Sequence, residues 1–167
     1  IYRFASKVDI VQEFSGSRDV SESLFDIKAD GMTALHDAIS KAAQELKKRD
    51  ERRRAIIVIS DGADTISGSS ADKALKAAIS ADALIYTVDM SAIETGGKER
   101  MQNQGVLRNF AEKSGGKFIA APGGAALRQA FKGIVEELGL QYTIGYEPID
   151  QQKDGKWRAI ELKVSRP

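Results

Sequence analysis

Two polar loops carry the residues with the clearest chemical potential. Asp61 comes just after an apolar run at residues 55–59, so it lies at the carboxyl end of a predicted buried strand. Thr33 opens a segment whose apolar residues recur at helical spacing. Ligands of open α/β sheets bind beyond the carboxyl ends of the strands, and a carboxylate there can hold a hard cation. Both loops are therefore candidate binding loops.

Each of these two residues also has a purely structural interpretation. Asp61 precedes a glycine, and Asp-Gly is common in turns where the aspartate accepts backbone N–H bonds. Thr33 could cap the helix predicted over residues 33–49, because threonine is a favoured N-cap residue. The loops taken one at a time leave both interpretations open.

Other candidate residues are explained better by structure than by chemistry. His36 is the only histidine, so any Ser-His-Asp relay must use it, but no nucleophile-elbow pattern accompanies it. We interpret it as an ordinary helix residue. Residues 52–54 are three arginines after a lysine-rich helix end, which is typical of a solvated face rather than a phosphate site.

The paired glycines and two aromatic residues also lack a functional pattern. The pairs at residues 115–116 and 123–124 fit neither the Gly-x-Gly-x-x-Gly fingerprint nor a P-loop, so nucleotide binding has no support. Tyr146 and Trp157 are most simply packing residues of a hairpin.

Strands and helices are expected to alternate through most of the chain. Predicted strands span residues 2–4, 8–14, 55–59, 83–88, 117–120, 141–146 and 157–164. Predicted helices span residues 19–27, 33–49, 71–81, 106–113 and 125–138, with a polar loop at 91–104. This order predicts one α/β domain over residues 1–167. Its sheet is doubly wound, Rossmann-like and mostly parallel, with helices on both faces and an antiparallel C-terminal edge hairpin.

Composition excludes several classes of protein. The chain has no cysteine, so disulfides, thiolate zinc sites and cysteine nucleophiles are excluded. Its net charge of +1 gives no argument for nucleic-acid binding, and no apolar run reaches the roughly 20 residues that span a bilayer. The chain opens directly on a strand-like sequence without a methionine, so we expect residue 1 to be a cut edge of a longer polypeptide.

The two loops together resemble a known family. Residues 31–39 read GMTALHDAI and residues 54–64 read RAIIVISDGAD, a combination similar to the von Willebrand factor A (VWA) domain. The closing segments QYTIGY at 141–146 and WRAI at 157–160 resemble a bacterial branch of VWFA-related proteins. The resemblance covers nearly the whole chain, and the pairing of the two motifs is more specific than either motif alone.

The resemblance implies a non-enzymatic adhesion or protein-interaction module that works through a metal-ion-dependent adhesion site (MIDAS), usually with Mg²⁺. In that family three loops share the ion. Thr33 matches the threonine of the second loop, and Asp61 matches the aspartate of the third. The ion would then accept an acidic side chain of a protein ligand. The resemblance also implies an exported protein, periplasmic or secreted.

One element of the family pattern is missing. The first loop should supply Asp-x-Ser-x-Ser after a central first strand, and no such motif occurs in the chain. Without that strand the sheet would contain a slot with unpaired backbone groups on both sides, which is costly. Three resolutions follow: a strand present in the native protein but outside this chain, a segment exchanged from another chain, or rearranged strands. With the first loop absent, the site is partial and an ion should be bound weakly or not at all.

Two alternatives to the interaction module remain. The first is a Rossmann-like metal-dependent hydrolase or phosphatase that uses Asp61 as nucleophile or metal ligand. Asp89, at the end of the next predicted strand, is the one candidate partner for it. The second alternative is a structural VWA scaffold with no working metal site.

Overall fold

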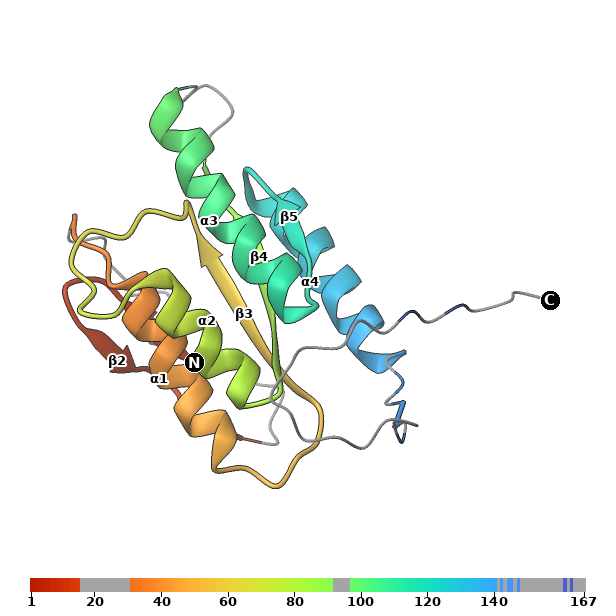
Figure 1. Ribbon diagram of the computed structural model, residues 1–167. Coiled ribbons are helices and arrows are strands. Elements are labelled where there is room, and N and C mark those ends of the chain that lie inside the picture. Colours follow the sequence, from red (N-terminus) through yellow and green to blue (C-terminus); the bar gives the residue numbers. More distant parts are fainter. Residues whose placement is uncertain are drawn as a thin grey trace.

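The computed structural model describes residues 1–15, 31–91 and 97–140, together with the single positions 142, 144, 145, 147, 161 and 163. Nine elements lie within this part of the chain (Figure 1). They are β1 (Tyr2–Phe4), β2 (Val8–Ile10), α1 (Leu35–Lys47), β3 (Arg54–Ser60), α2 (Ala71–Ser80), β4 (Ala83–Asp89), α3 (Lys98–Ser114), β5 (Phe118–Ala120) and α4 (Gly124–Gly139).

The main sheet is parallel, in the order β3-β4-β5. β3 pairs with β4 along its whole length, from Arg54 opposite Ala83 to Ser60 opposite Asp89. Helices α2 and α3 form the crossovers between these strands, as parallel pairing requires. The apolar runs of β3 and β4 are those of strands covered on both faces, and this confirms the prediction of a mostly parallel α/β sheet.

Helices cover both faces of this sheet. Because side chains alternate along a strand, Ile56, Val58 and Ile85 enter one core cluster with α1, α2 and α3. Tyr86 and Val88 enter a second cluster with α4 on the opposite face. Figure 1 shows α4 and α1 on opposite sides of the strands. The predicted doubly wound, Rossmann-like arrangement is therefore confirmed.

The glycine pair at the end of α3 has a structural role. Gly115 ends the helix in the left-handed conformation, with φ of 83°. A Cβ atom on Gly116 would lie 2.1 Å from the carbonyl oxygen of Ile85, so the backbone of this turn packs directly against β4. Close approach to β4 explains the pair without any nucleotide.

Two predicted boundaries are wrong. Residues 91–104 were expected to be a loop, but α3 already begins at Lys98. Residues 98–104 contain one apolar side chain, Met101, so they show no apolar periodicity, although Lys, Glu, Arg, Met and Gln are good helix formers. The second predicted strand, residues 8–14, pairs only over Val8–Ile10. The predicted helix at 19–27 lies outside the described residues, and so do most positions of the predicted C-terminal strands at 141–146 and 157–164.

The described strands form two separate sheets. β1 and β2 make an antiparallel hairpin, with Tyr2 opposite Ile10 and Phe4 opposite Val8. The Lys41 ammonium of α1 donates a hydrogen bond to the Val8 carbonyl oxygen (3.0 Å) and ties the hairpin to the helix layer. No pairing joins β1 to β3 among the described strands. Rearranged strands have therefore not closed the expected slot in this part of the chain.

Candidate functional site

Asp61 occupies the position predicted for it, at the carboxyl end of β3. Its side chain is exposed, and its Oδ1 atom accepts a hydrogen bond from the Ala63 backbone N–H (3.0 Å). The next residue, Gly62, has φ of 85°, and a Cβ atom there would lie 2.5 Å from the Asn103 carbonyl oxygen. The turn interpretation of Asp61 is thus correct in geometry. It leaves the carboxylate at the surface, where a ligand could reach it.

Thr33 is not the cap of the following helix. The N-cap of α1 is Ala34, which offers no side-chain hydrogen bond. Instead, Asp64 Oδ1 accepts from the His36 N–H (3.2 Å) and Ser67 Oγ accepts from the Asp37 N–H (3.1 Å). The segment after β3 therefore caps α1 from a distance. The N-cap interpretation of Thr33 is wrong because the helix begins one residue later than that role requires.

The backbone of Thr33 is anchored to the loop that follows Asp61. Its N–H donates to Thr65 Oγ1 (2.8 Å), and its carbonyl oxygen accepts from the Thr65 N–H (2.8 Å) and the Ile66 N–H (3.3 Å). These bonds hold the two candidate loops together at one edge of the molecule. The association of the loops was expected from the sequence, but the residues that make it were not.

His36 forms no Ser-His-Asp relay among the described residues. Its Nδ1 atom lies 3.2 Å from Asp64 Oδ2, and its ring lies 5.8 Å from the ring of Phe110. Its Nε2 atom is buried and has no hydrogen-bond partner among the described residues. The nearby Ser67 hydroxyl donates to Asp64 (2.6 Å), not to the imidazole. A serine nucleophile would need to contact Nε2, so His36 serves the packing of α1.

Asp89 lies beside Asp61 at the same edge but is occupied. Ser60 pairs with Asp89 across β3 and β4, which places the two strand ends together. The Asp89 side chain is 1% exposed and accepts from the Ser91 N–H (2.9 Å), the Ser91 hydroxyl (2.6 Å) and the Gln104 amide (2.6 Å). Three donors thus engage this carboxylate inside the protein, which does not favour a role as a second catalytic acid.

A polar cleft of about 450 Å³ opens next to Asp61. It is lined by Asp61, Ala63, Ser91, Gly97, Glu99, Arg100 and Asn103. The first turns of α3 supply three of these residues, and sequence reasoning missed them because it placed a loop there. Thr33 does not line this cleft. Among the described residues, no group of three His, Cys, Asp or Glu side chains could hold a metal ion.

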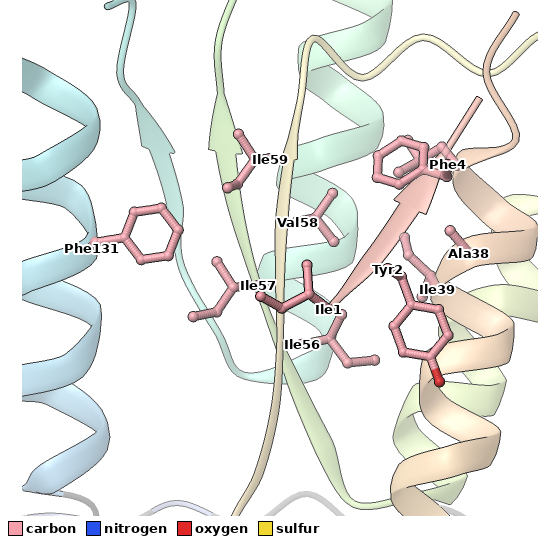
Figure 2. A pocket seen from close by; sticks show the side chains of 11 residues that line it. Ile1, Tyr2, Phe4, Ala38, Ile39, Ile56, Ile57, Val58, Ile59 and Phe131 are labelled. Carbon is pink, nitrogen blue, oxygen red and sulfur yellow. The ribbon is translucent and has the colours of Figure 1, made fainter. Parts of the chain in front are cut away.

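An apolar slot lies on the other side of β3, between that strand and the N-terminal hairpin (Figure 2). It has a volume of about 520 Å³, and its walls come from β1, α1, β3 and α4. Figure 2 shows Ile57 and Ile59 pointing toward Phe131, and Ile56 and Val58 pointing toward α1. The slot lies where the sequence predicted a missing strand.

The arginines at 52–54 differ in their surroundings. Arg54 donates to the carbonyl oxygens of Ala81 (2.9 Å) and Arg49 and so ties the start of β3 to neighbouring turns. Arg52 and Arg53 are exposed, as a solvated face requires.

Two solved structures are similar to this chain. A crystal structure of an aerotolerance-related membrane protein from Bacteroides fragilis, carrying multiple mutations to serine, is similar with a TM-score of 0.56 and 21% identity. The match covers 84% of this chain and 78% of that one. A structure of an uncharacterized membrane-spanning protein from Vibrio fischeri is similar with a TM-score of 0.45 and 22% identity, over 70% of this chain and 63% of that one. No curated protein matches.

None of the helices in the described part of the chain is both long and apolar enough to cross a bilayer. The sequence pattern of the von Willebrand factor type A domain family matches residues 1–132. That range includes every described strand and most of the described helices. Domains of this family are generally non-enzymatic protein-interaction modules. The match covers well over half of the sequence, so the chain belongs to the von Willebrand factor type A domain family.

Proposed function

We propose that this VWA domain binds a protein ligand through a divalent cation, Mg²⁺, held in part by Thr33 and Asp61. The observation that carries the proposal is the anchoring of the Thr33 backbone to Thr65 and Ile66, in the loop that continues from Asp61. That anchoring keeps a hydroxyl and an exposed carboxylate on adjoining loops at the edge where α/β sheets bind ligands.

These two side chains supply only part of a coordination shell. Mg²⁺ takes oxygen ligands in octahedral geometry and usually keeps several waters. With a single carboxylate and a hydroxyl from the described residues, a bound ion would retain much of its positive charge. An acidic side chain of a protein partner is the natural ligand for such an ion. Binding of this kind makes and breaks no covalent bond, so the proposal does not include an enzyme activity.

The remaining ligands are proposed to come with a β-strand that fills the apolar slot and lies outside residues 1–167. Among the described strands β3 pairs only with β4, and its other edge faces the apolar slot. An apolar slot beside an unpaired strand edge is costly in water, because both the side chains and the backbone groups lack partners. A strand in the slot would end at the same edge as β3, near Asp61.

Calorimetric titration of the full-length protein with Mg²⁺ tests the metal site. Thr33→Ala and Asp61→Ala are each expected to abolish measurable binding, because each removes a direct ligand. Asp72→Ala changes an exposed aspartate in the first turn of α2 and is expected to leave the affinity unchanged. Unchanged affinity in either ligand variant would contradict the shared site and would favour a structural scaffold.

Thiol labelling tests the slot, because the chain contains no cysteine of its own. Ile59 lines the slot and is 39% exposed, whereas Ile79 is 45% exposed and does not line the slot. A maleimide should label Ile59→Cys in residues 1–167 alone but not in the full-length protein, and should label Ile79→Cys in both. If the maleimide does not label Ile59→Cys in residues 1–167 alone, and that protein has a dimeric mass, a strand exchanged between copies fills the slot. Labelling of Ile59→Cys in both forms would contradict a filled slot.

The hydrolase or phosphatase alternative has its own test. It needs Asp61 as nucleophile or metal ligand, and its candidate partner Asp89 is engaged by Ser91 and Gln104. Turnover of generic phosphate or ester substrates that Asp61→Asn abolishes would establish it.

We also propose a periplasmic or secreted location, supported by the resemblance of the closing segments to exported bacterial relatives. Cell fractionation with an antibody against the domain would test that location.

A further inference from the structure

The start of α1 and the segment after β3 hold each other through reciprocal hydrogen bonds. Asp64 and Ser67 cap the helix, as described above. In return, the Asp37 carboxylate of the first helical turn accepts hydrogen bonds from the Gly68 N–H (2.9 Å) and the Ser69 N–H (2.9 Å). We call this arrangement, formed by residues 33–37 and 64–69, the clasp. Each side of the clasp contributes one carboxylate that accepts backbone N–H groups of the other side.

The two ends of the clasp are held by hydrogen bonds of different strength. At one end, Thr33 bonds to Thr65 and Ile66 through backbone groups and the Thr65 hydroxyl. At the other end, Asp37 holds Gly68 and Ser69. Charged acceptors make stronger hydrogen bonds than neutral ones, so the Asp37 end is the stronger support of the loop. The Thr33 end has neutral donors and acceptors only.

Asp37 does not belong to the proposed metal site itself. Both of its carboxylate oxygens are already engaged by backbone N–H groups of the clasp. Its location in the first turn of α1 also places its charge favourably with respect to the helix dipole. It can act on a ligand at Thr33 and Asp61 by fixing the Asp61 loop, and the electric field of its charge acts on a cation as well. Hydrogen exchange without metal isolates the first of these effects.

We infer that Asp37 is a positioning residue whose carboxylate holds the Asp61 loop against Thr33 and thereby sets the affinity of the ion site. The effect on metal affinity rests on the proposed function. The effect on the clasp does not, because hydrogen exchange can detect it with no metal present. Residues that orient metal ligands without touching the metal typically change affinity by about 10–100-fold when they are substituted.

Hydrogen exchange in the full-length protein without metal is the first test, with Asp37→Asn as the variant. The asparagine side chain has the size of the aspartate side chain but replaces one acceptor oxygen by an NH₂ donor. One of the two hydrogen bonds from the Gly68 and Ser69 N–H groups is therefore lost. The Thr65 and Ile66 amides, which do not contact Asp37, are expected to exchange at least about tenfold faster in the variant. Asp72→Asn is the matched control, since Asp72 also lies in the first turn of a helix. In Asp72→Asn the Thr65 and Ile66 amides should exchange at the same rate as in the parent.

Magnesium titration is the second test. Asp37→Asn is expected to weaken Mg²⁺ binding by about 10–100-fold. Lys41→Met serves as a control for general destabilisation, because Lys41 ties α1 to the hairpin and lies outside the clasp. It is expected to bind Mg²⁺ as the parent does. A loss of affinity common to both variants would mean that Asp37 acts only through overall stability, and would overturn the inference.

The two tests separate failure of the inference from failure of the proposed function. Faster exchange limited to Gly68 and Ser69, with Thr65 and Ile66 unchanged, would overturn the positioning role whatever the metal does. Absence of Mg²⁺ binding in the parent would refute the proposed site, while the exchange of Thr65 and Ile66 would still decide whether Asp37 holds the clasp.

Discussion

The two edges of β3 belong to the same strand but have different surroundings. One edge pairs with β4 through all seven residues of the strand. The other edge faces the apolar slot, where α1 and the hairpin approach but do not pair. Ile85, on the neighbouring strand of the paired side, is fully buried, whereas Ile59 beside the slot is 39% exposed. An apolar run therefore indicates that a strand is covered on both faces and does not identify which strands pair with its edges.

The connection between β3 and its surroundings also differs on the two sides. On the β4 side it is a backbone ladder along the whole strand. On the slot side no ladder is present among the described strands, and contact is made by the packing of Ile56 and Val58 against α1 and by the clasp at one end. Lys41 in turn ties α1 to the hairpin. The ladder is insensitive to pH, whereas the clasp depends on an ionised carboxylate. Acid should therefore weaken the slot side at a pH that leaves the β4 side intact.

The largest expected effect comes from truncating the paired side. Ile85→Ala removes a fully buried side chain that packs between β3 and α3, and should lower the free energy of unfolding by about 2–5 kcal/mol. Ile59→Ala in residues 1–167 should cost about 1 kcal/mol or less, because its site is already partly open. Urea unfolding of both variants measures the difference. Equal costs would mean that the two edges are equally covered.

Acid should weaken the slot side before the paired side. The pKa of Asp37 lies below its ordinary value because the Gly68 N–H and Ser69 donate hydrogen bonds to its carboxylate. A depressed pKa in the folded state contributes stability above the unfolded-state value of about 3.9, and that stability is lost as pH falls through the folded value. Asp37→Asn should thus be less stable than the parent at neutral pH, and the gap should narrow below about pH 4.

Thermal unfolding of the parent and Asp37→Asn between neutral and acidic pH measures this narrowing. Asp72→Asn is the matched variant that controls for replacing a carboxylate by an amide in the first turn of a helix. A constant gap between the parent and Asp37→Asn would show that the carboxylate charge does not support the clasp.

The smallest effect is expected at the far wall of the slot. Lys41→Met removes one hydrogen bond to the Val8 carbonyl oxygen and should cost about 1 kcal/mol. Exchange of the hairpin amides should quicken while the β3 and β4 amides stay protected. Lys73→Met, at an exposed lysine of α2, should change neither quantity. Loss of protection in β3 as well would mean that the hairpin and the main sheet unfold together.

Regular patterns in the sequence were sufficient for the main sheet and most of its helices. The apolar run at 55–59 and the helical spacing after Thr33 predicted β3 and α1 correctly, and Asp61 lies at the predicted strand end. The start of α3 could not be predicted, because residues 98–104 contain only one apolar side chain, Met101, and leave no apolar stripe to detect. Glu99, Arg100 and Asn103 of the cleft were missed for the same reason.

The supports of the candidate site were harder to predict than its ligands. Thr33 and Asp61 belong to short recognisable motifs, whereas Asp64 and Ser67 cap a helix that begins far earlier in the chain. Capping rules compare a helix with its own flanking residues, so they assigned the role to Thr33. A cap supplied across the fold has no local signature and becomes visible only in three dimensions.

The borrowed cap of α1 has a consequence for the order in which the domain folds. An isolated helix of this length is marginal in water, because nucleating the first turn is unfavourable. The groups that stabilise the first turn of α1 follow β3 in the chain, so during synthesis they emerge after the helix itself. We therefore expect α1 to consolidate late, in one step with β3 and the loop behind it. The first helix of the described chain would be among the last to gain protection, which pulsed hydrogen exchange during refolding can measure.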